Sequence, residues 1–322
     1  MRNILVVSLT PLESSNNDIL RQGCGFIFPL RVFLTGLICV LAFLSIPGIR
    51  AQDNASTRSI EVKEYPLAVT DNTKNRPSSF AKVLTPQLIM ADKHVPGDFP
   101  IFSIGKVEGV ELMLIDQNQN GSYDEIGTDL MVFDKSRYGV PVSSVINLKN
   151  KLYECKVDPK GQKISLKSYE GKCSELDLVS GFKCPTAADL LIINSGDIYI
   201  DLAGNKKALV PCASYNIWLG YIEEGTSHVA IKQNQMKPIE VAEAVDKDGK
   251  MIPTAIQWGA SFRFEFDFSV DDSNNVKVTY KSLRVYGVTE EEYYNFSPKI
   301  FPQVGVLDAK KDLVSKGAFC VG

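Results

Sequence analysis

The stretch Phe262-Arg-Phe-Glu-Phe-Asp-Phe268 alternates strictly between phenylalanine and a charged residue. Successive side chains of a β-strand point to opposite faces, so the rings lie on one face and the charges on the other. An α-helix would distribute the same rings around its axis. The stretch therefore predicts a strand of an antiparallel sheet that buries one face and exposes the other.

The same period of two recurs along the chain between polar turns such as Asp158-Pro-Lys-Gly161 and Asp246-Lys-Asp-Gly249. No long segment has a helical period, and a single short helical turn is expected at Thr289-Glu-Glu-Glu292. We predict an all-β fold of two or three antiparallel β-sandwich-like modules in series. Besides the phenylalanine stretch, strands are expected at residues 153–157, 164–166, 198–202, 215–221, 229–232, 239–245 and 276–280.

Composition narrows the class of protein. The chain has 322 residues, of which 44% are apolar, and 35 Lys and Arg stand against 38 Asp and Glu. The apolar share is that of a globular chain and excludes disorder of the whole chain. The net charge of −3 provides no basic surface for a run of phosphates, so nucleic acid is not an expected partner.

An apolar segment near the N-terminus predicts the cellular location. Residues 32–49 carry no charge and follow Arg21 and Arg31, which is the pattern of a signal peptide, here with cleavage after Ala51. An uncleaved membrane anchor is one alternative, because 18 apolar residues reach the length that spans a bilayer, and a buried core helix is another. We expect a secreted, periplasmic or cell-surface protein that contacts a membrane only through an uncleaved N-terminal segment.

Five cysteines remain after residue 51: Cys155, Cys173, Cys184, Cys212 and Cys320. In an oxidising compartment they can pair, in any of several connectivities. Buried free thiols are the alternative. None of the spacings is C-x-x-C, so no zinc site is expected.

The stretch Asp116-Gln-Asn-Gln-Asn-Gly-Ser-Tyr-Asp-Glu-Ile-Gly-Thr-Asp129 carries the clearest chemistry. It resembles the start of an EF-hand or dockerin calcium loop, in which alternate side chains on a tight turn direct oxygens inward and a glycine at position 6 reverses the backbone. Calcium prefers six to eight oxygen ligands. The expected ligands are Asp116, Asn118, Asn120, the carbonyl of Ser122, Asp124 and Asp129.

Two features distinguish this stretch from an EF-hand. Position 12, which is a bidentate Glu in EF-hands, is Gly127, and the next carboxylate belongs to Asp129. The flanking residues 110–115 and 130–133 favour strands instead of helices. The loop is therefore expected to join two strands of a hairpin and to bind calcium in the weak extracellular range, about 10⁻⁴ to 10⁻³ M. A metal-free polar turn is the alternative.

A second resemblance concerns the middle of the chain. Gly196-Asp-Ile-Tyr-Ile-Asp-Leu202, followed by Leu209-Val-Pro-Cys-Ala-Ser-Tyr215, is similar to the end of a prealbumin-like, or carboxypeptidase-regulatory-like, β-sandwich domain. In that family an lPaGxY segment enters the last strand, and here Cys212-Ala-Ser214 replaces its central residues. The resemblance implies a small seven-stranded sandwich at 145–225.

These observations predict five regions. Residues 1–51 are the signal peptide or anchor, 52–99 a linker or N-terminal arm, and 100–144 a β-hairpin region with the calcium loop. Residues 145–225 are the prealbumin-like module and 226–322 a C-terminal antiparallel β module.

Catalytic signatures are absent from the sequence, which has no HExxH, GxSxG or glycine-rich phosphate loop. His94 and His228 are isolated, and no cysteine has a histidine near it in the sequence. We therefore favour a calcium-stabilised β-sandwich protein with a non-catalytic binding, adhesion or structural role, and expect no enzymatic activity. The alternative is a carbohydrate-active or peptide-active hydrolase that uses a carboxylate pair such as Glu265 and Asp267.

The ligand of such a protein is expected to be a carbohydrate or another protein. Trp218, Tyr221 and Trp258 are candidates for an aromatic surface on which a sugar ring stacks. Burial in the core is the alternative for all three, because most Trp and Tyr residues are at least partly buried.

Overall fold

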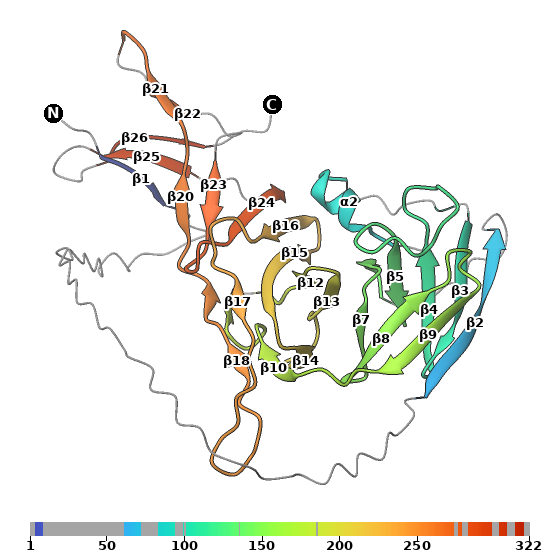
Figure 1. Ribbon diagram of the computed structural model, residues 1–322. Coiled ribbons are helices and arrows are strands. Elements are labelled where there is room, and N and C mark those ends of the chain that lie inside the picture. The colour runs from blue at the N-terminus through green and yellow to red at the C-terminus, as the bar shows by residue number, and fades with distance from the viewer. Residues whose placement is uncertain are drawn as a thin grey trace, which may run out of the picture. The chain divides into compact units, whose positions relative to one another are not determined.

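The computed structural model describes residues 4–8, 61–71, 83–93, 99, 101–134, 136–184, 186–273, 276–278, 283–297, 303–307 and 313–318. These residues belong to one compact unit of the chain. The unit is built almost entirely from antiparallel sheets, two of which have eight strands each (Figure 1). The prediction of an all-β fold is confirmed.

The first large sheet is antiparallel throughout, with the strand order β6-β5-β4-β3-β2-β9-β8-β7. It consists of β2 (Val62–Asp71), β3 (Ile101–Val107), β4 (Val110–Ile115), β5 (Leu130–Phe133), β6 (Val140–Pro141), β7 (Val145–Leu148), β8 (Lys151–Val157) and β9 (Lys163–Ser168).

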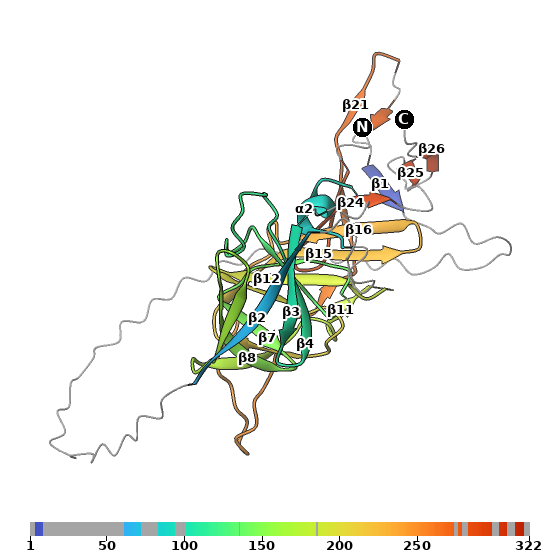
Figure 2. The same cartoon turned by 90° about the vertical axis from the view of Figure 1, so that its right-hand side faces the viewer.

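Strand β2 connects the two halves of this sheet, as its position beside β3 in Figure 2 illustrates. Its residues up to Pro66 pair with β9, and its residues from Leu67 onward pair with β3. Gly105 faces this change of partner, where an added Cβ would lie 2.8 Å from the carbonyl oxygen of Pro66. A side chain at position 105 would therefore force the strands apart.

The two halves of the sheet bury one common core. Leu112 and Leu114 of β4 belong to the same buried cluster as Leu148 of β7 and Ile164 of β9. These strands lie in different halves of the strand order, so the sheet folds over on itself around the cluster. Leu112 and Ile164 are both fully buried, and burying such a side chain contributes about 1.5–3 kcal/mol.

The strands of this sheet come from residues that the sequence analysis placed in different regions of the chain. Val62–Asp71 lies in the predicted linker, yet its first half pairs with β9 and its second half with β3, so it is an interior strand of the sheet. Residues 145–168 were assigned to the prealbumin-like module, yet β7, β8 and β9 complete the first sheet. Polar residues such as Ser143 and Ser144 are as frequent in a loop that ends a domain as in one that connects two strands of one sheet, so composition alone does not distinguish the two.

The second large sheet has the order β13-β12-β15-β16-β24-β23-β20, with β17 paired to β15. The predicted boundary at 225/226 falls in the turn of the β15–β16 hairpin, whose strands pair from Gly220↔Ile231 to Glu224↔Ser227. The strands are β12 (Leu190–Ser195), β13 (Ile198–Asp201), β15 (Ser214–Glu224), β16 (Ser227–Lys232), β17 (Ile239–Glu240), β20 (Arg263–Glu265), β23 (Arg284–Tyr286) and β24 (Glu292–Ser297).

Smaller sheets and one short helix complete the described chain. β10 (Cys173–Asp177) pairs with β14 (Ala208–Pro211) and, in parallel, with β18 (Thr254–Ala255). β11 (Phe182–Lys183) pairs in parallel with β19 (Trp258–Gly259). The remaining elements are the β21 (Phe268–Val270) and β22 (Val276–Val278) hairpin, the sheet of β1 (Ile4–Ser8), β25 (Gln303–Leu307) and β26 (Leu313–Ala318), and α2 (Pro86–Met90).

Strand β1 lies inside the predicted signal peptide and pairs with β25. The apolar segment 32–49 and the expected cleavage position at Ala51 lie outside the described residues. Within the part of the chain that the structure describes, no helix has the length and apolar character needed to cross a membrane.

The phenylalanine stretch forms a strand at its start but not over its full length. Phe262 packs edge-to-face on Tyr293, and Phe264 and Phe266 are half-buried while the charged residues between them are exposed. The strand β20 ends at Glu265, and Phe268 begins the separate β21–β22 hairpin with 57% of its surface exposed. The alternation therefore predicted the buried face correctly, but not the point at which the strand leaves the sheet.

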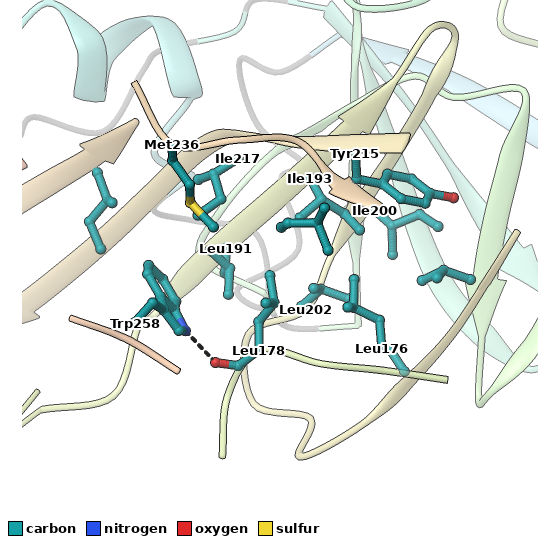
Figure 3. Close-up of a cluster of buried hydrophobic side chains, with 14 of the residues drawn as sticks. Leu176, Leu178, Leu191, Ile193, Ile200, Leu202, Tyr215, Ile217, Met236 and Trp258 are labelled. Atoms are coloured by element: carbon teal, nitrogen blue, oxygen red, sulfur yellow. Dashed lines mark hydrogen bonds between the residues drawn. The ribbon is translucent and has the colours of Figure 1, made fainter. Parts of the chain in front are cut away.

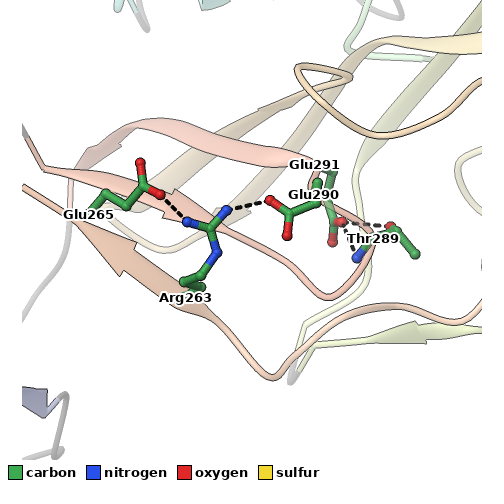
Figure 4. Close-up of polar contacts among 5 residues, drawn as sticks. All are labelled: Arg263, Glu265, Thr289, Glu290 and Glu291. Carbon is green, nitrogen blue, oxygen red and sulfur yellow. Dashed lines mark hydrogen bonds and ion pairs between the residues drawn. The ribbon is translucent and has the colours of Figure 1, made fainter. Parts of the chain in front are cut away.

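The short helical turn expected at 289–292 is absent, and Glu292 instead begins β24. Figure 4 shows the contact that replaces it: the Glu291 carboxylate accepts hydrogen bonds from the backbone N–H and the hydroxyl of Thr289. Glu291 also accepts from the backbone N–H of Gly259 (2.7 Å) and the hydroxyl of Tyr293 (3.1 Å). These bonds satisfy a fully buried carboxylate, and they explain why a turn forms here without a helix.

A second cluster of buried side chains lies on the second large sheet, and Trp258 is its largest fully buried member (Figure 3). Its ring packs against Phe182 with 4.1 Å between the ring centroids, and its indole N–H donates to the carbonyl oxygen of Leu178 (2.5 Å). Leu191 and Ile193 of β12 line the same cluster. The indole thereby ties the small β11–β19 sheet to the second large sheet.

Replacing this indole tests the anchoring role. Trp258→Phe removes the donor to Leu178 and part of the buried ring, which should lower the free energy of unfolding by about 2–4 kcal/mol. The matched control is Trp218→Phe, because the half-buried Trp218 contacts Tyr199 and makes no hydrogen bond through its indole in the described structure. Urea denaturation followed by circular dichroism measures both. Equal losses in the free energy of unfolding for the two variants would contradict the anchoring role of Trp258.

Candidate functional site

The loop at 116–129 connects β4 to β5, which pair antiparallel from Leu112↔Phe133 to Ile115↔Leu130. Both flanks are strands, as the sequence predicts. The loop therefore closes a β-hairpin. The helix-opening motion of EF-hand sensors requires flanking helices, and none is present here.

The side chains at loop positions 1, 3 and 5 are directed into the turn. The Asp116 carboxylate accepts hydrogen bonds from the backbone N–H groups of Asn120 (3.2 Å) and Gly121 (2.7 Å). The Asn118 Oδ1 accepts from Asn120 N, and the Asn120 Oδ1 accepts from Ser122 N (2.8 Å). Gly121 has φ +85°, in the left-handed region that glycine adopts without strain. These bonds hold the loop in a defined shape through side-chain oxygens.

Asp129 ties the two ends of the loop together. It is fully buried, and its two carboxylate oxygens accept from Gln117 N (3.1 Å) and Glu125 N (2.9 Å). Burial raises the pKa of Asp129 to about 6, which the two backbone N–H groups oppose and the negative charges of Asp116 and Glu125 reinforce. The group is nevertheless charged at neutral pH, so a buried negative charge lies at the base of the loop.

Glu125 is a residue of this site that the sequence did not predict. Its carboxylate accepts from the side-chain amides of Asn118 and Asn120, the latter at 3.0 Å. It occupies loop position 10, which supplies no side-chain ligand in an EF-hand. The only available signal was the excess of acidic residues in the loop.

The predicted ligands do not all converge on one point. Asp124 accepts from the hydroxyl of Ser122 (2.6 Å), whereas Asp116 is directed toward Gly121 N and Asp129 toward the ends of the loop. Among the described residues, no set of three or more His, Cys, Asp or Glu side chains is arranged to hold a metal ion. The structure thus brings Asp116, Asn118, Asn120 and Glu125 together and leaves Asp124 and Asp129 at the margins.

The charges of the loop are uncompensated. No Lys or Arg occurs between Lys106 and Lys135. Within the described residues, none of the four carboxylates of Asp116, Asp124, Glu125 and Asp129 forms an ion pair. Mutual repulsion of like charges in a short loop disfavours this conformation unless a cation is bound.

The other candidates from the sequence are not assembled into a site. Glu265 forms an ion pair with Arg263, which also contacts Glu290 on the exposed face of the sheet (Figure 4). Trp258 and Tyr221 are 0% and 1% exposed, so neither can stack on a sugar ring. Of the three aromatic candidates, only Trp218 is half-buried, with its ring edge-to-face against Tyr199.

The histidines and cysteines that the structure describes also form no catalytic arrangement. His228 lies 3.3 Å from a carboxylate oxygen of Asp92, while His94 falls outside the described residues. Cys155, Cys173, Cys184 and Cys212 are free thiols. Burial raises the pKa of Cys155 to about 12, so this thiol remains protonated and unreactive at neutral pH.

No protein-family model, curated protein or solved structure matches this chain.

The role of Asp129 can be tested by replacing it with its amide. Asp129→Asn keeps one acceptor but directs an N–H₂ group at Glu125 N or Gln117 N, leaving a buried backbone donor unsatisfied. The free energy of unfolding should fall by about 1–3 kcal/mol at pH 7 in chelator. The control is Asp246→Asn, which lies in another turn and retains its Oδ1 acceptor. It should change the free energy of unfolding by less than about 0.5 kcal/mol.

The pH dependence adds a second readout. The pKa of Asp129 is higher in the folded protein than in the unfolded chain, so its contribution is fully present below the unfolded pKa and is lost as the pH rises through about 6. The stability gap between wild type and Asp129→Asn should therefore be wider at pH 4.5 than at pH 7. A gap that narrows at low pH would show that Asp129 is not the buried acid described here.

Proposed function

We propose that the loop at 116–129 binds a calcium ion, and that this ion stabilises a β protein with a non-catalytic binding, adhesion or structural role outside the cytoplasm. The observation that carries the proposal is the presence of four carboxylates in fourteen residues without an ion pair to any described basic side chain. A divalent cation would remove their mutual repulsion.

The ligand chemistry favours calcium over transition metals. The available donors are carboxylate, amide and carbonyl oxygens, which suit hard cations, and the loop offers neither thiolate nor imidazole. Carboxylate and amide oxygens that accept one hydrogen bond keep a further lone pair. Asp116, Asn118 and Asn120 can therefore bind an ion while retaining the backbone contacts that shape the loop.

Two other features of the loop support this proposal. The backbone is already ordered by the side chains, so less conformational entropy is lost when an ion binds. Glu125, which lies against the amides of Asn118 and Asn120, adds a carboxylate near the predicted ligands and takes the place of the Glu that an EF-hand carries at position 12. The backbone carbonyl of Ser122 and the carboxylates of Asp124 and Asp129 are the remaining proposed ligands.

The proposed affinity fits the proposed location. A loop with two neutral amides among its ligands belongs to the weak class of about 10⁻⁴ to 10⁻³ M, which requires the millimolar calcium found outside cells. At a few times the dissociation constant, binding to the folded state alone contributes about 1 kcal/mol. The non-catalytic role is inferred from the all-β architecture together with the lack of catalytic motifs in the sequence.

Thermal unfolding of the purified chain in calcium and in chelator tests the proposal. Millimolar calcium should raise the melting temperature of the wild type by about 2–4 °C. Asp116→Ala should abolish this rise, because it removes the carboxylate at loop position 1. Identical melting temperatures of the wild type in calcium and in chelator would refute the site.

A matched control is available in a second turn of the chain. Asp246 accepts hydrogen bonds from the backbone N–H groups of Asp248 and Lys250 (both 2.9 Å), much as Asp116 does within its own loop. Asp246→Ala should lower the melting temperature slightly but preserve the response to calcium. If both variants lose the response, the effect of calcium does not arise at the loop.

A further inference from the structure

A separate cavity of about 300 Å³ lies where β13 of the second sheet meets β6 and β7, the two edge strands of the first sheet. Its volume is at the lower end of the range for small-molecule sites. Its walls combine polar and apolar groups in similar measure, and they come from both sheets. The apolar residues used in the following argument are Val140, Pro141, Ile146, Leu148 and Ile200.

One polar group in this wall has unused bonding capacity. The Asp201 Oδ1 accepts hydrogen bonds from Leu191 N and Ala203 N, both at 2.9 Å. Its Oδ2 has no hydrogen bond and no ion pair within the described part of the chain. Burial raises the pKa of Asp201 to about 6, against the effect of the two backbone N–H groups. Asp201, a residue of the cavity wall, therefore carries a negative charge at neutral pH and keeps one oxygen without a partner in the described part of the chain.

The lysine of this cavity does not neutralise that charge. Lys149 is exposed, and its ammonium group donates to the carbonyl oxygen of Glu108 (3.1 Å). Asp134, a second carboxylate at the exposed rim, adds further negative potential. A cationic group that entered the cavity would meet a carboxylate oxygen in a partly desolvated environment, where charge-assisted hydrogen bonds are strong.

A larger cavity of about 840 Å³ on β8 and β9 lacks this feature. Two of its three lysines are already paired, Lys163 with Glu64 at 2.8 Å and Lys167 with Glu154 at 3.1 Å, and the third, Lys156, is exposed. The two remaining charged side chains of its wall, Lys156 and Asp158, are opposite in sign, so the wall carries no excess of either charge. The cavity at β13 is thus the better candidate, although it is smaller.

We propose that the cavity at β13 binds a small primary ammonium compound with an apolar chain, the ammonium group donating to the Asp201 Oδ2 and the chain packing on Ile146 and Leu148. An ammonium group supplies up to three donors and a full positive charge. Apolar lining gives a favourable contribution of about 25 cal/mol per Å² of ligand surface buried. This inference does not depend on calcium binding at the loop.

Two sources can present this chemistry: a free amine, or the side chain of a lysine. Three probes separate them on the full chain by titration calorimetry: n-pentylammonium, the uncharged 1-pentanol, and lysine capped at both its α-amino and carboxyl groups. Pentylammonium should bind at least tenfold more tightly than pentanol. Binding of pentylammonium without capped lysine indicates a free amine, whereas comparable binding of both indicates a lysine side chain.

The decisive variant is Asp201→Asn, which can keep the Oδ1 acceptor for Leu191 N and Ala203 N and replaces the free oxygen with an amide donor. In this variant the ratio of the affinity for pentylammonium to the affinity for pentanol should fall at least tenfold. The matched control is Asp177→Asn, because the buried Asp177 also accepts a backbone N–H through Oδ1, from Ser180, but lies outside the cavity. This control should keep the preference.

Two further measurements keep the proposal testable if Asp201→Asn unfolds. Ala203→Leu fills the cavity from its wall and should weaken binding of both pentyl compounds. Binding of pentylammonium to the wild type should also weaken as the pH falls from 7 to 5, because Asp201 takes up a proton near pH 6. No binding of pentylammonium at millimolar concentration, equal affinity for pentanol, or an unchanged preference in folded Asp201→Asn would overturn the proposal.

Discussion

The backbone contact between Ser143-Ser144 and strand β13 joins the two large sheets. Ser143 Oγ accepts from Tyr199 N (2.9 Å), and Ser144 N donates to the carbonyl oxygen of Asp197 (3.0 Å). Ser143 is 2% exposed, and its hydroxyl also donates to the carbonyl oxygen of Val145 (2.6 Å), so the buried hydroxyl is fully bonded at this junction. The contact also covers β6 and β7, the open edges of the first sheet, which would otherwise be free to pair with another chain.

The loop at 116–129 and the cavity are both attached to this junction. Val142, directly before Ser143, accepts from Gly127 N of the loop (3.1 Å) and donates its own N–H to the carbonyl oxygen of Asp129 (2.7 Å). Gly127 has φ +79°, and an added Cβ there would lie 2.8 Å from the Tyr199 hydroxyl. Asp201, two residues after Tyr199, lines the cavity. An ion bound by the loop, as proposed above, would therefore stabilise the region in which the two sheets meet.

Three carboxylates of this protein, of which Glu291 and Asp129 are fully buried, differ in how fully their oxygens are bonded. Glu291 accepts four hydrogen bonds and acts within the fold alone. Asp129 uses both oxygens once, which shapes the loop and keeps lone pairs for a cation. Asp201 uses a single oxygen. Asp177, which is buried outside the cavity, also uses a single oxygen. Unused lone pairs alone therefore do not define a candidate site, and the surroundings of Asp129 in the loop and of Asp201 in the cavity wall do.

The sequence by itself determined what local periodicity and turn chemistry control: the all-β class, strands such as Val110–Ile115 and Leu130–Phe133, and the glycine-pivoted loop between them. It could not show that Val62–Asp71 joins two halves of a sheet, that Glu125 lies against two loop amides, or that Asp201 faces a cavity. Alternation fixes which side chains share a face of a strand. The partner of that strand, and the burial of a charge beside it, depend on residues far away in the chain, which only the tertiary structure brings together.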